Sequence, residues 1–156
     1  MIEIERKFLL ADDSWRPLVK RKAYMAQGYL GGTNASVRLR VAGVDAWLNI
    51  KSRTLGTTRL EFEYPIPRGD AEQMLRELGD GPLVSKMRHY VHIESHTFEI
   101  DEFDGDNQGL IVAEVELEHA DQDFPRPAWL GQEVTDDARY YNSNLVRRPY
   151  ASWGHP

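Results

Sequence analysis

Charged and apolar residues alternate along most of this chain, and this period of two constrains the fold more than any other feature. Near the start, Glu3 and Glu5 alternate with Ile4, and further along Arg38 and Arg40 flank a leucine. A period of two is the property of an extended strand, because successive side chains point to opposite faces. The sequence therefore predicts a mainly β protein whose strands each have one charged and one apolar face.

The alternation recurs in eight segments separated by glycine, proline and short polar turns. The predicted strands are residues 2–10, 23–30, 35–42, 46–53, 58–66, 83–94, 97–103 and 111–118. Short connections favour antiparallel neighbours. Helical periodicity is confined to 12–22, to 70–79 with Asp70 as N-cap and Gly79 just beyond the C-terminus, and to the stretch after Asn142.

Eight strands and few helices predict a closed antiparallel β-barrel flanked by short helices. A two-layer sheet with helices on one face is the alternative architecture. The length of 156 residues suits one domain, and neither a repeat nor a low-complexity linker divides 1–156.

The overall charge and composition argue against several partners. The chain has 25 acidic and 19 basic residues, a net charge of −6, so general attraction to nucleic acid or anionic membranes is disfavoured. It has no cysteine, which excludes disulfides and thiolate metal sites. The first ten residues carry four charges where an export signal needs an apolar run, so we expect a cytoplasmic protein.

Each charged row taken alone is explained by the solvated face of a sheet. The rows, however, pair like with like: Glu114 with Glu116, Arg38 with Arg40, and Lys86 with an arginine two residues on. A solvated face gains nothing from like-charged neighbours, whereas a metal needs converging oxygens and a polyanion needs converging cations. This clustering predicts that the charged rows line the inside of the barrel and form a site.

The predicted lining contains eight acids and seven bases. The acids are Glu3, Glu5, Glu61, Glu63, Glu99, Asp101, Glu114 and Glu116, and the bases are Lys7, Arg38, Arg40, Lys51, Arg59, Lys86 and Arg88. Their net charge is −1, which about two divalent cations would change to about +3. An eight-stranded barrel is wide enough for one small ligand. The lining would thus accept a multiply charged phosphate chain when metal is bound.

The charged motifs also occur in a characteristic order. They are 3–7 (EIERK, an E-x-E-x-K pattern), 27–30 (QGYL), 38–40 (RLR), Lys51, 59–63 (RLEFE), 86–88 (KMR), 99–101 (EID), 114–116 (EVE), 133–135 (EVT) and 139–140 (RY). This ordered set, spanning about 2–145, resembles the CYTH superfamily, also called the triphosphate tunnel metalloenzymes. The resemblance implies an eight-stranded antiparallel tunnel that binds a triphosphate with Mg²⁺ or Mn²⁺, about two ions.

The resemblance also implies residue roles. The metal ligands would be Glu3, Glu5, Glu114 and Glu116. Glu61, Glu63 and Asp101 would support a metal or position the attacking water, with Lys7 as a further catalytic residue. Phosphate oxygens would be held by Lys7, Arg38, Arg40, Lys51, Arg59, Lys86, Arg88 and Arg139. These residue types suit the chemistry, since carboxylates bind hard cations and arginine forks bind phosphate.

Three functions are compatible with such a lining. The first is metal-dependent hydrolysis of inorganic tripolyphosphate or a related triphosphate. The second is a class IV-type adenylate cyclase, which must also hold adenine and direct the ribose 3′-hydroxyl. The third is a phosphate-chain binding or sensing protein without turnover. Loss of a metal carboxylate would be expected of a sensor, and every one is present, so an enzyme is favoured. The sequence does not distinguish a monomer from a homodimer.

Overall fold

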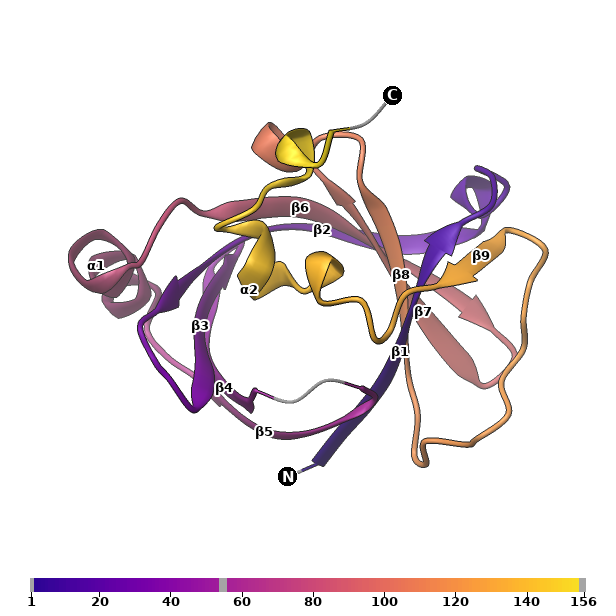
Figure 1. Cartoon of the computed structure of the whole chain (residues 1–156), viewed down its shortest axis with the longest axis horizontal. Helices are drawn as coiled ribbons and strands as arrows, with labels where there is room; N and C mark the ends of the chain where they lie inside the picture. Colours follow the sequence, from indigo (N-terminus) through magenta and orange to yellow (C-terminus); the bar gives the residue numbers. More distant parts are fainter. Residues whose placement is uncertain (1, 54–55, 155–156) are drawn as a thin grey trace.

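The computed structural model describes residues 2–53 and 56–154, and their strands form one closed antiparallel sheet. The strands are β1 (Ile2–Leu10), β2 (Val19–Leu30), β3 (Ala35–Ala42), β4 (Asp45–Ser52), β5 (Thr58–Pro65), β6 (Val84–Ile93), β7 (His96–Phe103), β8 (Ile111–Glu116) and β9 (Leu130–Glu133). Their order is β5-β4-β3-β2-β6-β7-β8-β1, and pairing of β5 with β1 closes the ring (Figure 1). The predicted eight-stranded antiparallel barrel is confirmed, with β9 as an extra strand on β1.

The register of the strands sets the direction of the charged rows. On β1 and β8, Glu5 pairs with Glu116 and Lys7 pairs with Glu114. Directly paired residues of antiparallel strands project to the same face of a sheet. The charged rows of neighbouring strands therefore share one face, which is the inside of the barrel, and the apolar rows share the outside.

The main hydrophobic core lies outside the barrel wall. It consists of Phe8, Trp15, Val91, Phe98, Ile100, Ala113, Val115, Leu117 and Trp129, all buried. Trp15 and Trp129 come from the connections that flank the strands and cover this outer face. Complete burial of a side chain such as Phe98 contributes about 1.5–3 kcal/mol. Packing on the outer face leaves the interior of the barrel to the charged side chains.

The helix predicted over 12–22 is wrong. Only a short 3-10 turn, η1 (Arg16–Leu18), forms there, and β2 already begins at Val19. The Ser14 backbone N–H donates to Asp12 Oδ1 at 2.8 Å, and this hydrogen bond closes a local turn just before η1. From Val19 onward the chain pairs with β6. Sheet pairing thus outweighs a weak local helical pattern.

The helix predicted over 70–79 is present but begins earlier, as α1 (Arg68–Leu78). Pro67 occupies the N-cap, so Asp70 lies inside the first turn and does not cap the helix. Gly79 follows in an extended conformation, with φ −64°, and does not adopt the left-handed conformation typical of glycine after a helix. α1 packs against β2, β3 and β4 from outside the barrel (Figure 1).

The end of the chain folds back across the barrel. After β9 come a 3-10 helix, η3 (Ala138–Tyr140), and the four-residue helix α2 (Asn142–Leu145), where a helix was predicted. Figure 1 shows this C-terminal segment, residues 134–146, lying across the ring of strands. Leu145 and Val146 anchor it by packing on Val84, Phe103, Leu110 and Val112.

The remaining regular elements are two 3-10 turns, η2 (Gly105–Asn107) and η4 (Tyr150–Ser152). Among the described residues, no helix has the length and hydropathy needed to cross a membrane.

Candidate active site inside the barrel

A cavity of about 230 Å³ lies inside the barrel, and the structure brings fourteen of the fifteen predicted lining residues together around it. They are Glu3, Glu5, Lys7, Arg38, Arg40, Lys51, Arg59, Glu61, Glu63, Lys86, Arg88, Glu99, Glu114 and Glu116. The fifteenth, Asp101, is buried behind two of these side chains. Six uncharged residues complete the lining: Tyr29, Ser36, Asn49, Tyr141, Asn142 and Ser143.

The order of the strands separates the charges into two arcs. Consecutive strands β7, β8, β1 and β5 carry the acidic arc, which consists of Glu99, Glu114, Glu116, Glu3, Glu5, Glu61 and Glu63. Three of the other four strands, β4, β3 and β6, carry the basic arc, which consists of Lys51, Arg38, Arg40, Lys86 and Arg88. Lys7 and Arg59 are bases placed among the acids. One cavity thus has carboxylates, which suit a metal ion, on one side and cations, which suit phosphate, on the other.

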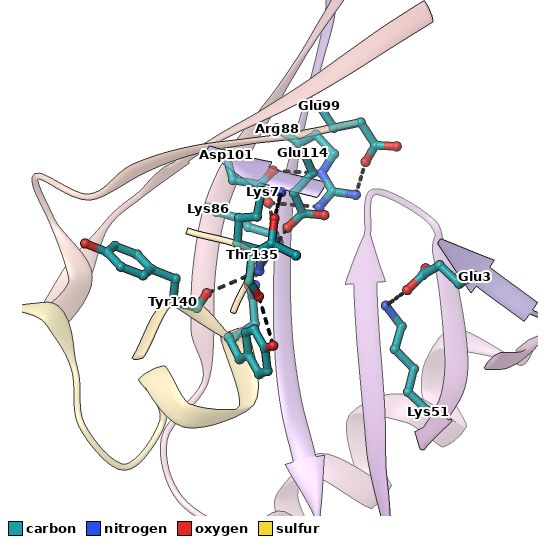
Figure 2. A network of polar contacts seen from close by, with 12 residues as sticks. Glu3, Lys7, Lys51, Lys86, Arg88, Glu99, Asp101, Glu114, Thr135 and Tyr140 are labelled. Atoms are coloured by element: carbon teal, nitrogen blue, oxygen red, sulfur yellow. Dashed lines mark hydrogen bonds and ion pairs between the residues drawn. The ribbon is translucent and has the colours of Figure 1, made fainter. Parts of the chain in front are cut away.

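Lys51 connects the two arcs. Its Nζ donates to Glu3 at 2.8 Å, as Figure 2 shows, and lies 3.4 Å from Glu61. Burial raises the pKa of Glu3 to about 7, and a hydrogen bond with Glu61 contributes to the rise. Burial disfavours the charge of Lys51, but the negative charges of Glu5 and Glu3 outweigh it and raise the Lys51 pKa. Near neutral pH, Glu3 is therefore close to its titration midpoint and has the Lys51 ammonium against it.

Glu5 and Glu114 are two buried carboxylates that affect each other's charge. Burial raises the pKa of Glu5 to about 8, and the negative charge of Glu114 adds to this. Burial also opposes ionisation of Glu114, but the charges of Lys7, Arg88 and Lys86 outweigh it and hold the Glu114 pKa well below its usual value. Glu5 therefore holds its proton more tightly than an ordinary glutamate does. A divalent cation bound by Glu5 would displace that proton.

The donor chemistry of the acidic arc fits a hard cation. The predicted metal ligands are Glu3, Glu5, Glu114 and Glu116, all oxygen donors of the kind that Mg²⁺ and Mn²⁺ prefer. As the side chains stand, no three His, Cys, Asp or Glu within 2–53 and 56–154 are gathered closely enough to hold a metal ion. Two of the four predicted ligands are instead paired with lysines, Glu3 with Lys51 at 2.8 Å and Glu114 with Lys7 at 3.4 Å.

One further carboxylate oxygen is suited to a cation. Among the described residues, Glu61 Oε2 is buried without a well-formed hydrogen bond in the structure, and the Lys51 ammonium lies 3.4 Å away. A buried carboxylate oxygen is costly when it is poorly paired. A metal ion would pair with this oxygen and would stabilise the charged forms of Glu3 and Glu5, whose pKa values are raised. These residues therefore fit the divalent cation that the sequence predicts.

Asp101 holds two cations of the basic arc from behind. Its oxygens accept from Lys86 Nζ at 2.7 Å and from Arg88 Nε and Nη2 at 2.7 and 2.8 Å (Figure 2). Burial would raise the pKa of Asp101, but Arg88 and Lys86 outweigh it and lower the pKa to about 2. Burial lowers the pKa of Lys86 to about 7. Arg88 also pairs with Glu99, and these contacts fix its direction towards the cavity.

Arg40 is held in a different way. Its Nε and Nη2 donate to the amide oxygen of Gln27, at 3.0 and 2.9 Å, and Gln27 is fully buried. Burial lowers the pKa of Arg40 to about 9, and the positive charges of Arg38 and Arg88 contribute to the fall. This pKa is still above neutral pH, so Arg40 keeps its charge, and a bound anion would stabilise that charge.

The C-terminal segment lines part of the cavity and forms hydrogen bonds with Lys7. The Lys7 backbone N–H donates to Thr135 Oγ1 at 3.0 Å, and its Nζ donates to the Tyr140 carbonyl at 3.3 Å (Figure 2). The Tyr141 ring lies 4.4 Å from the Arg59 guanidinium. Tyr141 and its neighbours in the lining were not predicted, because uncharged residues outside the alternating strands carry no signal in the sequence.

Arg139 is the one predicted phosphate ligand that the structure places elsewhere. Its guanidinium pairs with Asp137 at 2.7 Å and lies 5.1 Å from the Trp153 ring. The side chain is exposed, and it does not contribute to the cavity lining. The turn at 137–140 directs it away from the lumen, which the residue order alone does not reveal.

Comparison with known proteins identifies the family of this chain. The model of the CYTH domain matches residues 1–150, which include all nine strands and the C-terminal segment. The chain belongs to the CYTH family. The resemblance predicted from the charged motifs is thereby confirmed, and the match includes every strand that contributes to the cavity.

Two relatives of this CYTH protein have the name inorganic triphosphatase. The one from Acetivibrio thermocellus is 43% identical over 152 residues, 97% of each chain. The one from Nitrosomonas europaea is 38% identical over 151 residues, 94% of this chain and 97% of the relative. A crystal structure of an inorganic triphosphatase is 34% identical and covers 92% of this chain and 97% of that one, with a TM-score of 0.65.

The fold extends to more distant proteins. A proposed adenylyl cyclase from Hippeastrum with a dominant triphosphatase activity is 16% identical, with a TM-score of 0.55 over 75% of this chain and 80% of that one. At this identity the likeness shows the shared barrel alone.

Proposed function

We propose that this CYTH protein is a cytoplasmic enzyme that hydrolyses inorganic tripolyphosphate or a related triphosphate with the help of a divalent metal and releases phosphate. The observation that carries the proposal is the acidic arc facing the basic arc across one cavity. Phosphoryl transfer depends mostly on positioning and on neutralising charge, which such a cavity supplies. The names of the two relatives agree with this assignment.

Four carboxylates would hold Mg²⁺ or Mn²⁺, about two ions as in other two-metal phosphoryl-transfer sites: Glu3, Glu5, Glu114 and Glu116. Bound there, the metal would neutralise phosphate charge and supply an activated water at neutral pH. Glu61 and Glu63 lie on β5, next to β1, so we assign them to supporting the metal site and orienting the attacking water.

Seven cations would bind the phosphate chain: Lys7, Arg38, Arg40, Lys51, Arg59, Lys86 and Arg88. Lys51 and Lys7 both contact proposed metal carboxylates, Lys51 at 2.8 Å from Glu3 and Lys7 at 3.4 Å from Glu114, so both would bind phosphate oxygens near the metal site. We assign Asp101 to orienting Lys86 and Arg88, because it contacts both and does not line the cavity. Arg139 has no place in this scheme, since it lies outside the cavity.

The size and the lining of the cavity favour an inorganic substrate. Its volume of about 230 Å³ is below the ~300–1,000 Å³ that pockets for drug-sized organic ligands occupy. The lining is charged or polar apart from the faces of Tyr29 and Tyr141. A cyclase would need a surface for adenine as well as the phosphate site. The net charge of −6 also supports a small anion bound with metal rather than a nucleic acid or a membrane.

A substrate panel tests the proposal. Purified protein is incubated with tripolyphosphate, pyrophosphate, ATP or thiamine triphosphate, each with Mg²⁺ or Mn²⁺, and the products are identified. We expect orthophosphate from tripolyphosphate and slower turnover of ATP. Cyclic AMP as the main product from ATP would identify a cyclase, and binding of tripolyphosphate without release of phosphate would identify a sensor.

A further inference from the structure

We infer that Gln27 and Asn142 form a chain of two neutral amides that positions Arg40 and Lys86 for phosphate without adding negative charge beside them. The inference rests on the proposed function and adds two positioning residues to it. The chain links four parts of the fold, since its members come from β2, α2, β3 and β6.

Every link in this chain is a hydrogen bond with a defined direction. Arg40 Nε and Nη2 donate to Gln27 Oε1 at 3.0 and 2.9 Å. Gln27 Nε2 donates to the Tyr29 hydroxyl at 2.8 Å and to Asn142 Oδ1 at 3.3 Å. Lys86 Nζ donates to the same Asn142 oxygen at 3.0 Å. The two cations therefore fix both amides, because turning either one would place an NH₂ group against a positive charge.

The choice of an amide at position 27 has an electrostatic consequence. Gln27 is fully buried, so its polar atoms must be paired within the protein, and these contacts pair them. A carboxylate in its place would hold Arg40 more strongly, as Asp101 holds Arg88, but would also cancel its charge. An amide oxygen fixes the direction of the guanidinium and leaves the charge available for phosphate.

Asn142 extends the same arrangement to the end of the chain. It lies at the start of α2, in the C-terminal segment that crosses the barrel, and it lines the cavity. Its oxygen is the neutral partner of Lys86, whose other partner is Asp101. Docking of the C-terminal segment therefore completes the set of groups that direct Lys86 into the cavity.

The test compares Gln27→Glu with Gln27→Ala. Glutamate keeps an acceptor for Arg40 but neutralises it, whereas alanine removes the acceptor and leaves the charge. We expect Gln27→Glu to raise the KM for tripolyphosphate by about tenfold or more, and by more than Gln27→Ala does. The thermal midpoints should follow the opposite order, with Gln27→Ala less stable. If Gln27 had a purely structural role, the less stable variant would also have the higher KM. Gln27→Ala would then show both the lower thermal midpoint and the higher KM, which would overturn the inference.

Asn142→Asp and Asn142→Ala form a second pair, at a half-buried position where substitution endangers folding less. Aspartate would add a second carboxylate beside Lys86, which Asp101 already contacts, so Asn142→Asp should raise KM more than Asn142→Ala while kcat changes little. If the Gln27 variants do not fold, the KM values of these two Asn142 variants test the inference on their own. Gln132→Glu, exposed on β9, is the matched control for an added negative charge, and its KM should equal that of the wild type.

The outcomes separate this inference from the proposed function. If the wild type and Gln132→Glu release no phosphate from tripolyphosphate, the proposed function fails and the inference fails with it. If both are active but the acidic variants bind substrate as well as the alanine variants do, only the inference is overturned.

Discussion

Replacing Asp101 by asparagine should destabilise the protein strongly, because this carboxylate neutralises two buried cations. Asp101 is 1% exposed and accepts three hydrogen bonds from Lys86 and Arg88 at 2.7–2.8 Å. Removing one partner of a buried ionic network costs about 3–5 kcal/mol. The pKa gives a consistent magnitude: a value of about 2 in place of 3.8 corresponds to about 2–3 kcal/mol of stability at neutral pH.

The sign of the pH dependence follows from the lowered pKa. Stability from Asp101 is fully present above about pH 4 and is lost as the pH falls towards 2. At neutral pH, thermal unfolding of Asp101→Asn should show a midpoint lowered by about 10 °C. Exposed Asp106 provides the control, since Asp106→Asn should unfold like the wild type.

The same variant also tests the role given to Asp101 in the reaction. If Asp101→Asn unfolds within about 1 kcal/mol of the wild type but has lost turnover, the carboxylate acts on the substrate or metal directly. That result would refute its assignment as the group that orients Lys86 and Arg88.

Two further predictions concern the two arcs. Arg40→Ala should lower kcat/KM for tripolyphosphate about 10- to 100-fold, because a charge-assisted contact with phosphate is worth about 1.5–3 kcal/mol; steady-state kinetics equal to those of the wild type would place this side chain outside the substrate site. Mg²⁺ binding should release protons and strengthen as the pH rises from 6 to 8, because the raised pKa values of about 7 for Glu3 and about 8 for Glu5 keep both protonated at the lower pH. Titration calorimetry in two buffers of different ionisation enthalpy measures the released protons, and identical heats in both buffers would contradict the prediction.

The direction of most lining residues follows from the sequence because side-chain direction in an extended strand is set by parity. Parity does not determine how deeply an inward-facing side chain is buried in the barrel wall. Glu99 and Asp101 share the inward face of β7, yet only Glu99 lines the cavity, and Asp101 lies behind Lys86 and Arg88. That difference arises from packing between neighbouring strands, which parity does not describe.

The uncharged members of the site are harder to find from sequence. Gln27 lies within a strand that was predicted, but its role depends on meeting Arg40 and Asn142, which lie 13 and 115 residues away. β9 is only four residues long, too short for a pattern of alternation to be recognised. The segment 12–22 was assigned to a helix because its pairing with β6 is a long-range interaction.

Phosphate release from tripolyphosphate, measured with and without divalent metal, tests the central claim most directly. The wild type should release orthophosphate with Mg²⁺ or Mn²⁺ and none in the presence of a chelator. Glu116→Gln should lose this activity and keep its thermal midpoint, because Glu116 is an exposed carboxylate on the cavity wall and does not belong to the core. Release that persists without metal, or wild-type turnover by Glu116→Gln, would contradict the assignment of the acidic arc as the metal site.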